Sequence, residues 1–176
     1  MKRRHLLGGI ALGTSALVVG WSVMPPRQRL LPASPLPDVA GQTSLNGWVR
    51  IGSDDQVSVV MARSEMGQGV YTGLAMMLAD ELDARWDQIK FEPSGFDPIY
   101  NNQSVAADGL PFHPDDHGRV KQFAQWMTSK AMREIGLNAT GGSSSMKDLW
   151  LPMRQAGASA RAMLVTAAAQ QWQVPE

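Results

Sequence analysis

Two short segments of small and polar residues each stand directly in front of a predicted helix. The first is Glu65-Met66-Gly67-Gln68-Gly69, and the second covers residues 140–145. A helix N-terminus offers backbone N–H donors without helical partners and a partial positive charge, which suit a phosphate or another anion. Gln68 adds an uncharged amide, and the second segment adds hydroxyl groups. Together the two loops are typical of a site for a phosphorylated or strongly hydrogen-bonding cofactor.

Neither loop has the spacing of a nucleotide-binding fingerprint. The Gly-x-Gly-x-x-Gly pattern of dinucleotide-binding folds and the Gly-Lys-Ser/Thr end of a P-loop are both absent. Glycine loops before helices are often plain connections, and serine or threonine there often only caps the helix. The spacing alone therefore leaves both interpretations open.

Other chemistries have less support in the sequence. The chain contains no cysteine, which excludes disulfides, cysteine-ligated zinc, iron–sulfur clusters bound by this chain and thiol catalysis. Residues 113–117, His-Pro-Asp-Asp-His, hold four candidate metal ligands, but Pro114 and the short spacing make convergence on one ion awkward. No Ser-His-Asp arrangement is apparent. We therefore predict neither a metal site nor a catalytic residue in this chain.

The segments that position the two loops predict an α/β (or α+β) fold. Alternating apolar residues predict a β-hairpin over residues 48–52 and 56–61, and residues 86–92 predict a returning strand. Apolar residues at helical spacing predict three main helices, over residues 70–83, 118–135 and 146–172. The apolar stripe expected on the middle helix consists of Val120, Phe123, Trp126, Met127, Ala131 and Ile135. The order of strand, glycine loop, helix and strand places the first loop at the N-terminus of a crossover helix.

Residues 1–24 have the layout of an export signal. A basic start is followed by residues 6–23, which carry no charge. The paired Arg3-Arg4 resembles a twin-arginine export signal, a route that carries proteins already folded. No clear Ala-x-Ala cleavage site precedes Pro25, so the sequence leaves open whether this segment is removed or stays as a membrane anchor. We expect a periplasmic protein, attached to the membrane only if the signal is not cleaved.

The rest of the chain divides into a tether and one domain. Residues 25–46 are rich in proline and predict an extended tether outside the core, followed by a domain over residues 47–176. The whole chain has 16 basic and 16 acidic residues, but residues 1–29 contain basic residues and no acid. The folded body therefore carries a net negative charge, which gives it no electrostatic reason to bind nucleic acid.

Five motifs of the folded body carry a resemblance to a known family, and the Met-Gly-Gln-Gly of the first is specific in this context. They are residues 63–72 (Arg-Ser-Glu-Met-Gly-Gln-Gly-Val-Tyr-Thr), 79–83 (Ala-Asp-Glu-Leu-Asp), 108–116 (Asp-Gly-Leu-Pro-Phe-His-Pro-Asp-Asp), 140–145 (Thr-Gly-Gly-Ser-Ser-Ser) and 154–158 (Arg-Gln-Ala-Gly-Ala). With them, residues 47–172 resemble the N-terminal part of the molybdopterin-binding large (beta) subunits of the isoquinoline 1-oxidoreductase type. These belong to the xanthine oxidase and aldehyde oxidoreductase family of molybdenum hydroxylases.

The resemblance implies a function, cofactors and partners. Such enzymes hydroxylate an N-heteroaromatic compound or oxidise an aldehyde with oxygen derived from water. Electrons pass from a molybdopterin cofactor, often its cytosine dinucleotide form, to [2Fe–2S] clusters on a small partner subunit. The positions implied to hold the pterin are Gly67, Gln68, Gly69, Gly141, Gly142, Ser143, Ser144 and Ser145. Glu65 sits within the binding motif, so we do not assign it as a catalytic base.

The chain is several-fold shorter than the large subunits of this family. The remaining cofactor segments and the catalytic glutamate of the family lie beyond residue 176, so we expect a C-terminally truncated domain that is inactive alone. We also expect apolar surface that the missing segments would cover. The alternative is a non-catalytic exported module, or a truncated relic, that binds a partner subunit or a small anionic ligand.

Overall fold

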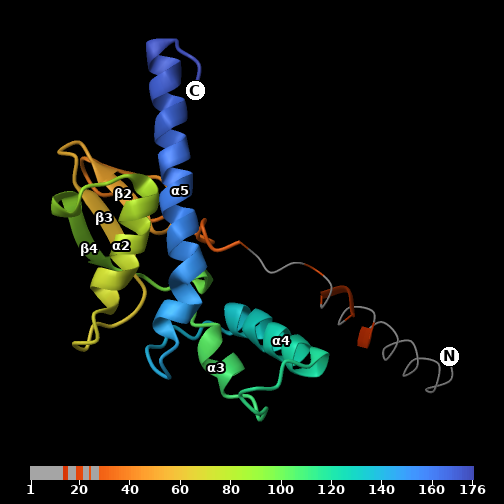
Figure 1. Ribbon diagram of the computed structural model, residues 1–176. Coiled ribbons are helices and arrows are strands. Elements are labelled where there is room, and N and C mark those ends of the chain that lie inside the picture. Colours follow the sequence, from red (N-terminus) through yellow and green to blue (C-terminus); the bar gives the residue numbers. More distant parts are fainter. Residues whose placement is uncertain (1–13, 16–18, 22–23, 25–27) are drawn as a thin grey trace.

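The computed structural model describes residues 14–15, 19–21, 24 and 28–176. The chain forms an α/β domain, which confirms the predicted fold class (Figure 1). Four strands form one sheet in chain order, with the first three antiparallel and the fourth parallel to the third. The strands are β1 (Gln42–Ser44), β2 (Val49–Gly52), β3 (Val57–Met61) and β4 (Ile89–Pro93).

The predicted hairpin is the β2–β3 pair at the centre of this sheet. Val49 lies opposite Val59 and Ile51 opposite Val57, so the alternating apolar residues share one face. Asp55 has a positive φ of 62° in the turn, where aspartate is among the residues that tolerate the left-handed region. Every residue of β3 is buried, as expected for a strand with neighbours on both sides.

Helix α2 (Val70–Leu82) connects β3 to the parallel strand β4 and covers one face of the sheet. Its buried residues recur at helical spacing, among them Val70, Leu74 and Leu78. The helix ends at Asp83 in a left-handed conformation, and a short 3-10 turn, η1 (Trp86–Gln88), leads into β4. This crossover places the loop at residues 65–69 at the N-terminus of α2.

Helix α5 (Ser145–Trp172) lies beside α2 and runs in the same direction (Figure 1). Near the start of both helices Gly73 faces Met146, and farther along Leu78 faces Gly157. At the end of α2, the Asp83 carboxylate forms an ion pair with Arg161. The N-termini of α2 and α5 therefore lie at the same end of the domain, and with them the two predicted loops.

A smaller group of helices lies beside the lower end of α5 (Figure 1). It comprises η2 (Pro98–Tyr100), α3 (Ser104–Asp108) and α4 (Arg119–Ile135). The apolar stripe expected on α4 is not its buried face, since Val120 and Ile135 are 74% and 71% exposed. The buried residues of α4 are Lys130, Met132 and Arg133. The long stems of Lys130 and Arg133 cover apolar surface, while their charged ends donate to the carbonyl oxygens of Met24 and Gln28.

The proline-rich segment contacts the domain from residue 28 onward. The carbonyl oxygen of Leu30 accepts a hydrogen bond from the Gly47 N–H at 2.7 Å, and β1 pairs with β2. Leu30 and Leu45 pack against the core. This corrects the expectation of a tether outside the core for residues 28–46, because prolines lack a donor but leave the carbonyl groups between them free to bond. The domain boundaries themselves stay predictions.

Most of the predicted export signal lies outside the described residues. Within the described part of the chain, no helix is both long and apolar enough to span a membrane.

Candidate functional site

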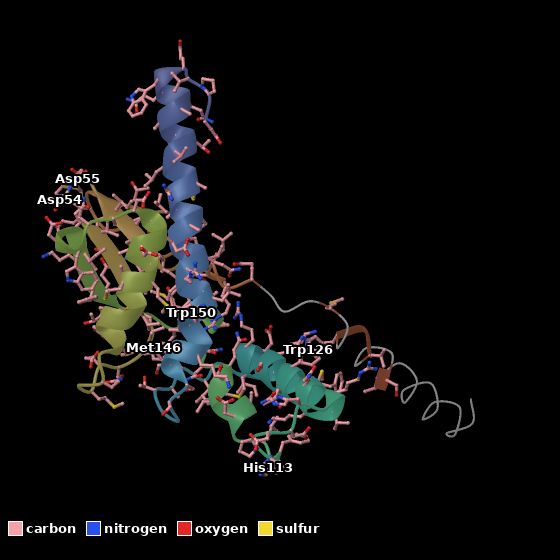
Figure 2. All side chains as sticks on the ribbon, viewed as in Figure 1. Asp54, Asp55, His113, Trp126, Met146 and Trp150 are labelled. Atoms are coloured by element: carbon pink, nitrogen blue, oxygen red, sulfur yellow. The ribbon has the colours of Figure 1, made fainter. Side chains whose placement is uncertain are left out.

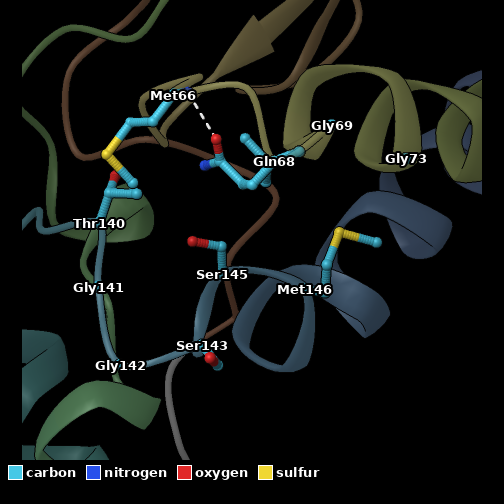
Figure 3. A pocket seen from close by; sticks show the side chains of 11 residues that line it. Met66, Gln68, Gly69, Gly73, Thr140, Gly141, Gly142, Ser143, Ser145 and Met146 are labelled. Atoms are coloured by element: carbon cyan, nitrogen blue, oxygen red, sulfur yellow. Dashed lines mark hydrogen bonds between the residues drawn. The ribbon is translucent and has the colours of Figure 1, made fainter.

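The two glycine loops meet at one pocket of about 540 Å³ (Figure 3). It opens between the N-termini of α2 and α5. The residues that line it are Met66, Gln68, Gly69, Val70, Gly73, Thr140, Gly141, Gly142, Ser143, Ser145 and Met146. Six of the eight predicted cofactor-binding residues are among them, and Gly67 and Ser144 are not. Proximity of the loops follows from the parallel packing of the two helices, which the spacing of the loops in the sequence does not show.

Glu65 organises the first loop. Its Oε1 accepts hydrogen bonds from the Gly67 N–H at 2.8 Å and the Gly69 N–H at 3.0 Å, and its Oε2 accepts one from the Tyr71 N–H at 3.0 Å. These backbone donors, that of Tyr71 foremost, lower the pKa of Glu65 from its ordinary value. The carboxylate thus uses donors at the N-terminus of α2, so fewer of them remain for a ligand.

The side chain of Gln68 bonds within its own loop. Its amide oxygen accepts from the Met66 N–H (Figure 3). Its Nε2 donates to the Ser64 carbonyl oxygen at 2.8 Å. Nε2 carries two hydrogens, so one remains for a second acceptor. Gln68 therefore shapes the loop that lines the pocket. Direct contact between this side chain and a cofactor stays a prediction.

Residues of the second loop face two directions, toward the pocket and toward the interior of the domain. Gly142 and Ser143 have positive φ values of 58° and 53°, a reversal that places both on the pocket wall. Ser144 is fully buried on the other side, where its hydroxyl donates to the Gly141 carbonyl oxygen at 2.6 Å and accepts from Asn102 at 2.7 Å. Ser144 holds the loop in shape, whereas the hydroxyls of Ser143 and Ser145 are available at the pocket.

The two loops also contact each other. The Ser64 N–H donates to the Thr140 hydroxyl oxygen at 2.8 Å, which fixes the distance between the loops. None of the residues that line the pocket has an ionisable side chain. The pocket can therefore bind a ligand through backbone groups, hydroxyls and methionine side chains, but its lining offers no group that moves a proton near neutral pH.

A buried charged cluster beneath the loops was not predicted from the sequence. Asp148, in the first turn of α5, forms ion pairs with Arg63 at 2.6 Å and Arg29 at 3.1 Å. Burial lowers the pKa of both arginines, and the charge of Asp148 opposes this effect. Both guanidinium groups stay protonated, so the cluster holds one net positive charge. Arg63 opens the recognised motif and Asp148 lies on the predicted helix over residues 146–172, but neither position indicates the other.

The His-Pro-Asp-Asp-His run lies away from the pocket. His113 is on the loop before α4, whereas Met146 marks the pocket at the start of α5 (Figure 2). The imidazole Nδ1 of His113 is 3.7 Å from the Asp115 carboxylate, and both side chains are exposed. Across the described residues, no three histidine or acidic side chains form a group that could hold a metal ion.

The fold and the pocket define an α/β domain with one candidate site between its two glycine loops. The sequence matches the model of a family described as "Molybdopterin cofactor-binding domain" over residues 9–111, a span that includes the first loop and ends before the second. The chain belongs to this family, which confirms the resemblance to molybdopterin-binding domains of the xanthine oxidase family. It is a module of an oxidoreductase family that uses a molybdenum cofactor.

Two relatives are similar over much of the chain. The beta subunit of isoquinoline 1-oxidoreductase from Brevundimonas diminuta is 31% identical over 144 residues, which is 81% of this chain and 15% of the relative. A membrane-bound aldehyde dehydrogenase (pyrroloquinoline-quinone) from Gluconacetobacter polyoxogenes is 30% identical over 118 residues, 67% of this chain and 11% of that protein. The chain thus spans less than a sixth of the length of either relative.

Proposed function

We propose that the pocket between the two glycine loops holds part of a molybdopterin cofactor in the large subunit of an exported molybdenum hydroxylase. The main observation that supports this proposal is that both loops line one uncharged pocket at the N-termini of two parallel helices. The N-terminus of α5 favours an anionic group such as the phosphate of a pterin cofactor, whereas the Glu65 carboxylate already occupies donors at the N-terminus of α2. The cavity of about 540 Å³ is within the size range of small-molecule sites.

The residues at the pocket fit such a cofactor. An added Cβ at Gly141 would have nothing within 4 Å, so the backbone there is open to a close approach by a ligand. Ser143, Ser145 and Gln68 would hold phosphate or pterin polar groups, and Met66 and Met146 would cover the ring face. When bound, the molybdenum centre would supply the two-electron oxidation of the substrate.

The substrate and the partners belong to the same proposal. The names of the two relatives support an N-heteroaromatic compound or an aldehyde as substrate. Because no residue at the pocket is ionisable, the proton transfers of hydroxylation would fall to groups outside this lining. We propose the cytosine dinucleotide form of the cofactor, [2Fe–2S] clusters on a small partner subunit and a periplasmic location. The export-like N-terminus and the family resemblance support these assignments.

A second candidate is a binding module that acts through a partner polypeptide. The exposed apolar end of α5 favours this candidate, and Figure 1 shows that this end extends beyond the sheet. After Arg161, the helix carries no charged residue, and Met163, Leu164, Val165 and Trp172 are exposed. A helix that is apolar all round is normally buried. The end of α5 would therefore pack against the rest of a large subunit or against a small subunit, so both candidates require a partner.

The test fills the pocket without disturbing the fold. Gly141→Leu places a side chain where an added Cβ meets nothing within 4 Å and where φ is not positive. Gly95→Leu is the matched control, because an added Cβ there also meets nothing within 4 Å and Gly95 is not part of this pocket. The protein is purified in its assembled form, with the partner polypeptides of its native host, and molybdenum and pterin are measured per chain. The melting temperature is compared for protein made without the cofactor.

We expect the assembled wild type and Gly95→Leu to carry molybdenum and Gly141→Leu to lose it, while the three proteins made without the cofactor share one melting temperature. Equal molybdenum in Gly141→Leu and the control would contradict the site. An assembled wild type that carries no molybdenum, including one that shows a quinone absorbance instead, would contradict the proposed function.

A further inference from the structure

Residues 28–30 are held to the domain through their backbone. The carbonyl oxygen of Gln28 accepts a hydrogen bond from Arg133 at 3.2 Å, and that of Arg29 accepts one from the Trp48 indole N–H at 2.5 Å. The Leu30 carbonyl oxygen accepts from the Gly47 N–H at 2.7 Å. Three consecutive carbonyl groups are thus bound, so the position of the Arg29 side chain is set by the chain itself.

The guanidinium of Arg29 enters the space between η2 and the start of α5. Its Nε donates to the Ile99 carbonyl oxygen at 2.9 Å, and its Nη2 donates to the Asn101 carbonyl oxygen at 2.9 Å. Nη1 and Nη2 also donate to Asp148, to its carbonyl oxygen and its carboxylate respectively, both at 3.1 Å. The side chain is only 11% exposed, and all three of its nitrogens are bonded.

Asp148 connects Arg29 to the two loops that line the pocket. Its carboxylate accepts from Arg63 at 2.6 Å and from the Gln103 and Ser104 N–H groups at 2.8 and 3.1 Å. Arg63 directly precedes Ser64, whose N–H and carbonyl oxygen anchor the first loop. Asp148 itself lies in the turn of α5 that follows the second loop. One carboxylate therefore connects Arg29 to both loops.

We propose that Arg29 is a positioning residue that completes the cofactor pocket, so that the site reaches its binding geometry only when the segment behind the export signal is docked. Without Arg29, Asp148 keeps Arg63 at Oδ2 and the Gln103 and Ser104 N–H groups at Oδ1, but its Oδ2 and its carbonyl oxygen each lose a charged donor. Asp148 is then held less firmly against η2, and both loops gain freedom. Formation of the pocket is thereby coupled to the docking of residues 28–30. This inference rests on the proposed function, because a fixed conformation of the two loops matters to the protein only if they hold the cofactor.

The test compares Arg29→Ala with Arg50→Ala in the full chain. Arg50 is a matched control, since it also pairs with a carboxylate, that of Glu92, and donates to the N-terminal segment at the Pro37 carbonyl oxygen. It is absent from the lining of the cofactor pocket. Amide hydrogen exchange is followed at Ser64, whose N–H bonds to Thr140, and at Gln103, whose N–H bonds to Asp148. Exchange at Val59 serves as the reference in the core.

We expect Arg29→Ala to accelerate exchange at Ser64 and Gln103 about tenfold or more, the factor that corresponds to losing a hydrogen bond to a charged group. Exchange at Val59 should be unchanged, and Arg50→Ala should leave Ser64 and Gln103 protected. Arg29→Lys keeps the charge but has one donor nitrogen, so it should restore protection only in part. If Arg29→Ala does not fold, Arg29→Lys decides by the same comparison.

Two results would overturn the inference. One is uniform acceleration over the whole chain in the Arg29 variants, which would mean a general loss of stability. The other is unchanged protection at Ser64 and Gln103. The exchange measurement involves no ligand. A wild type without molybdenum would therefore contradict the proposed function, but the comparison of the Arg29 and Arg50 variants would still be valid.

Discussion

Replacement of Gly157 by alanine tests the helix contact that brings the two loops together. A methyl group at Gly157 would lie 2.3 Å from the Leu78 carbonyl oxygen and 2.9 Å from the Cβ of Glu81. Normal contacts between non-bonded atoms are about 3.5–4.0 Å, so the helices would have to separate by about 1 Å. The obstacle is largely backbone of α2, which cannot rotate away as a flexible side chain can.

The expected loss of stability follows from two opposing effects. Overpacking of a tight contact costs about 1–3 kcal/mol, and a clash with backbone belongs at the upper end, about 3 kcal/mol. Alanine in place of glycine within a helix returns about 1 kcal/mol. We therefore expect Gly157→Ala to lower the free energy of unfolding by about 2 kcal/mol, which for a chain of this size lowers the melting temperature by about 4–8 °C.

Thermal and urea unfolding, followed by circular dichroism, measures this change. Gly73→Ala in α2 is the control, because its added Cβ meets only the flexible end of Met146, at 3.1 Å from Cε. We expect Gly73→Ala to change stability by less than about 1 kcal/mol, since the gain in helix propensity offsets a contact that can relax. A Gly157→Ala variant as stable as the wild type would refute the close helix contact and the pocket geometry derived from it.

Three further predictions follow from single side chains. Because backbone donors lower the pKa of Glu65 from its ordinary 4.5, the order it gives the first loop is complete above that pH and is lost as the pH falls through the lowered pKa. Glu65→Gln should therefore accelerate amide exchange at Gly69 at pH 7, and unchanged exchange would contradict this role. Burial raises the pKa of Tyr100 to about 12 from 10.0, so the stability of its neutral phenol is present below pH 10 and is lost between pH 10 and 12. Tyr100→Phe should remove this alkaline dependence in urea unfolding and cost about 1 kcal/mol at pH 7, because the hydrogen bond to Gly47 is lost; an alkaline transition that persists in the variant would exclude Tyr100 as its source. Processing of the export segment should leave Arg29 on the mature chain, and a mature N-terminus beyond Arg29, found by mass spectrometry, would contradict the coupling of that segment to the pocket.

Local sequence patterns were sufficient for the central elements of the fold. The alternation of Val57 and Val59 and the helical spacing of Leu74 and Leu78 report burial within one element, so the hairpin and α2 follow from them. The glycine loops were also recognisable, because their residues are neighbours in the sequence. Their meeting at one pocket depends on the α2–α5 contact at Gly157, which joins residues far apart in the chain.

The features that the sequence did not predict also depend on contacts between residues far apart in the chain. The stripe that includes Val120 and Ile135 shows that α4 is amphipathic, but not which neighbours exist to cover it. Arg29 and Asp148 are 119 residues apart, and no local pattern marks either as the partner of the other. Ser144 looked equivalent to its serine neighbours, yet the reversal at Gly142 and Ser143 turns it into the core.

The structure of the natively assembled protein with its cofactor tests the central claim most directly. The account predicts a pterin whose phosphate lies within hydrogen-bonding distance of the second loop, residues 140–145, and whose ring faces the first loop at residues 66–69. A molybdopterin bound elsewhere in the assembly, with both loops in contact only with protein, would contradict it.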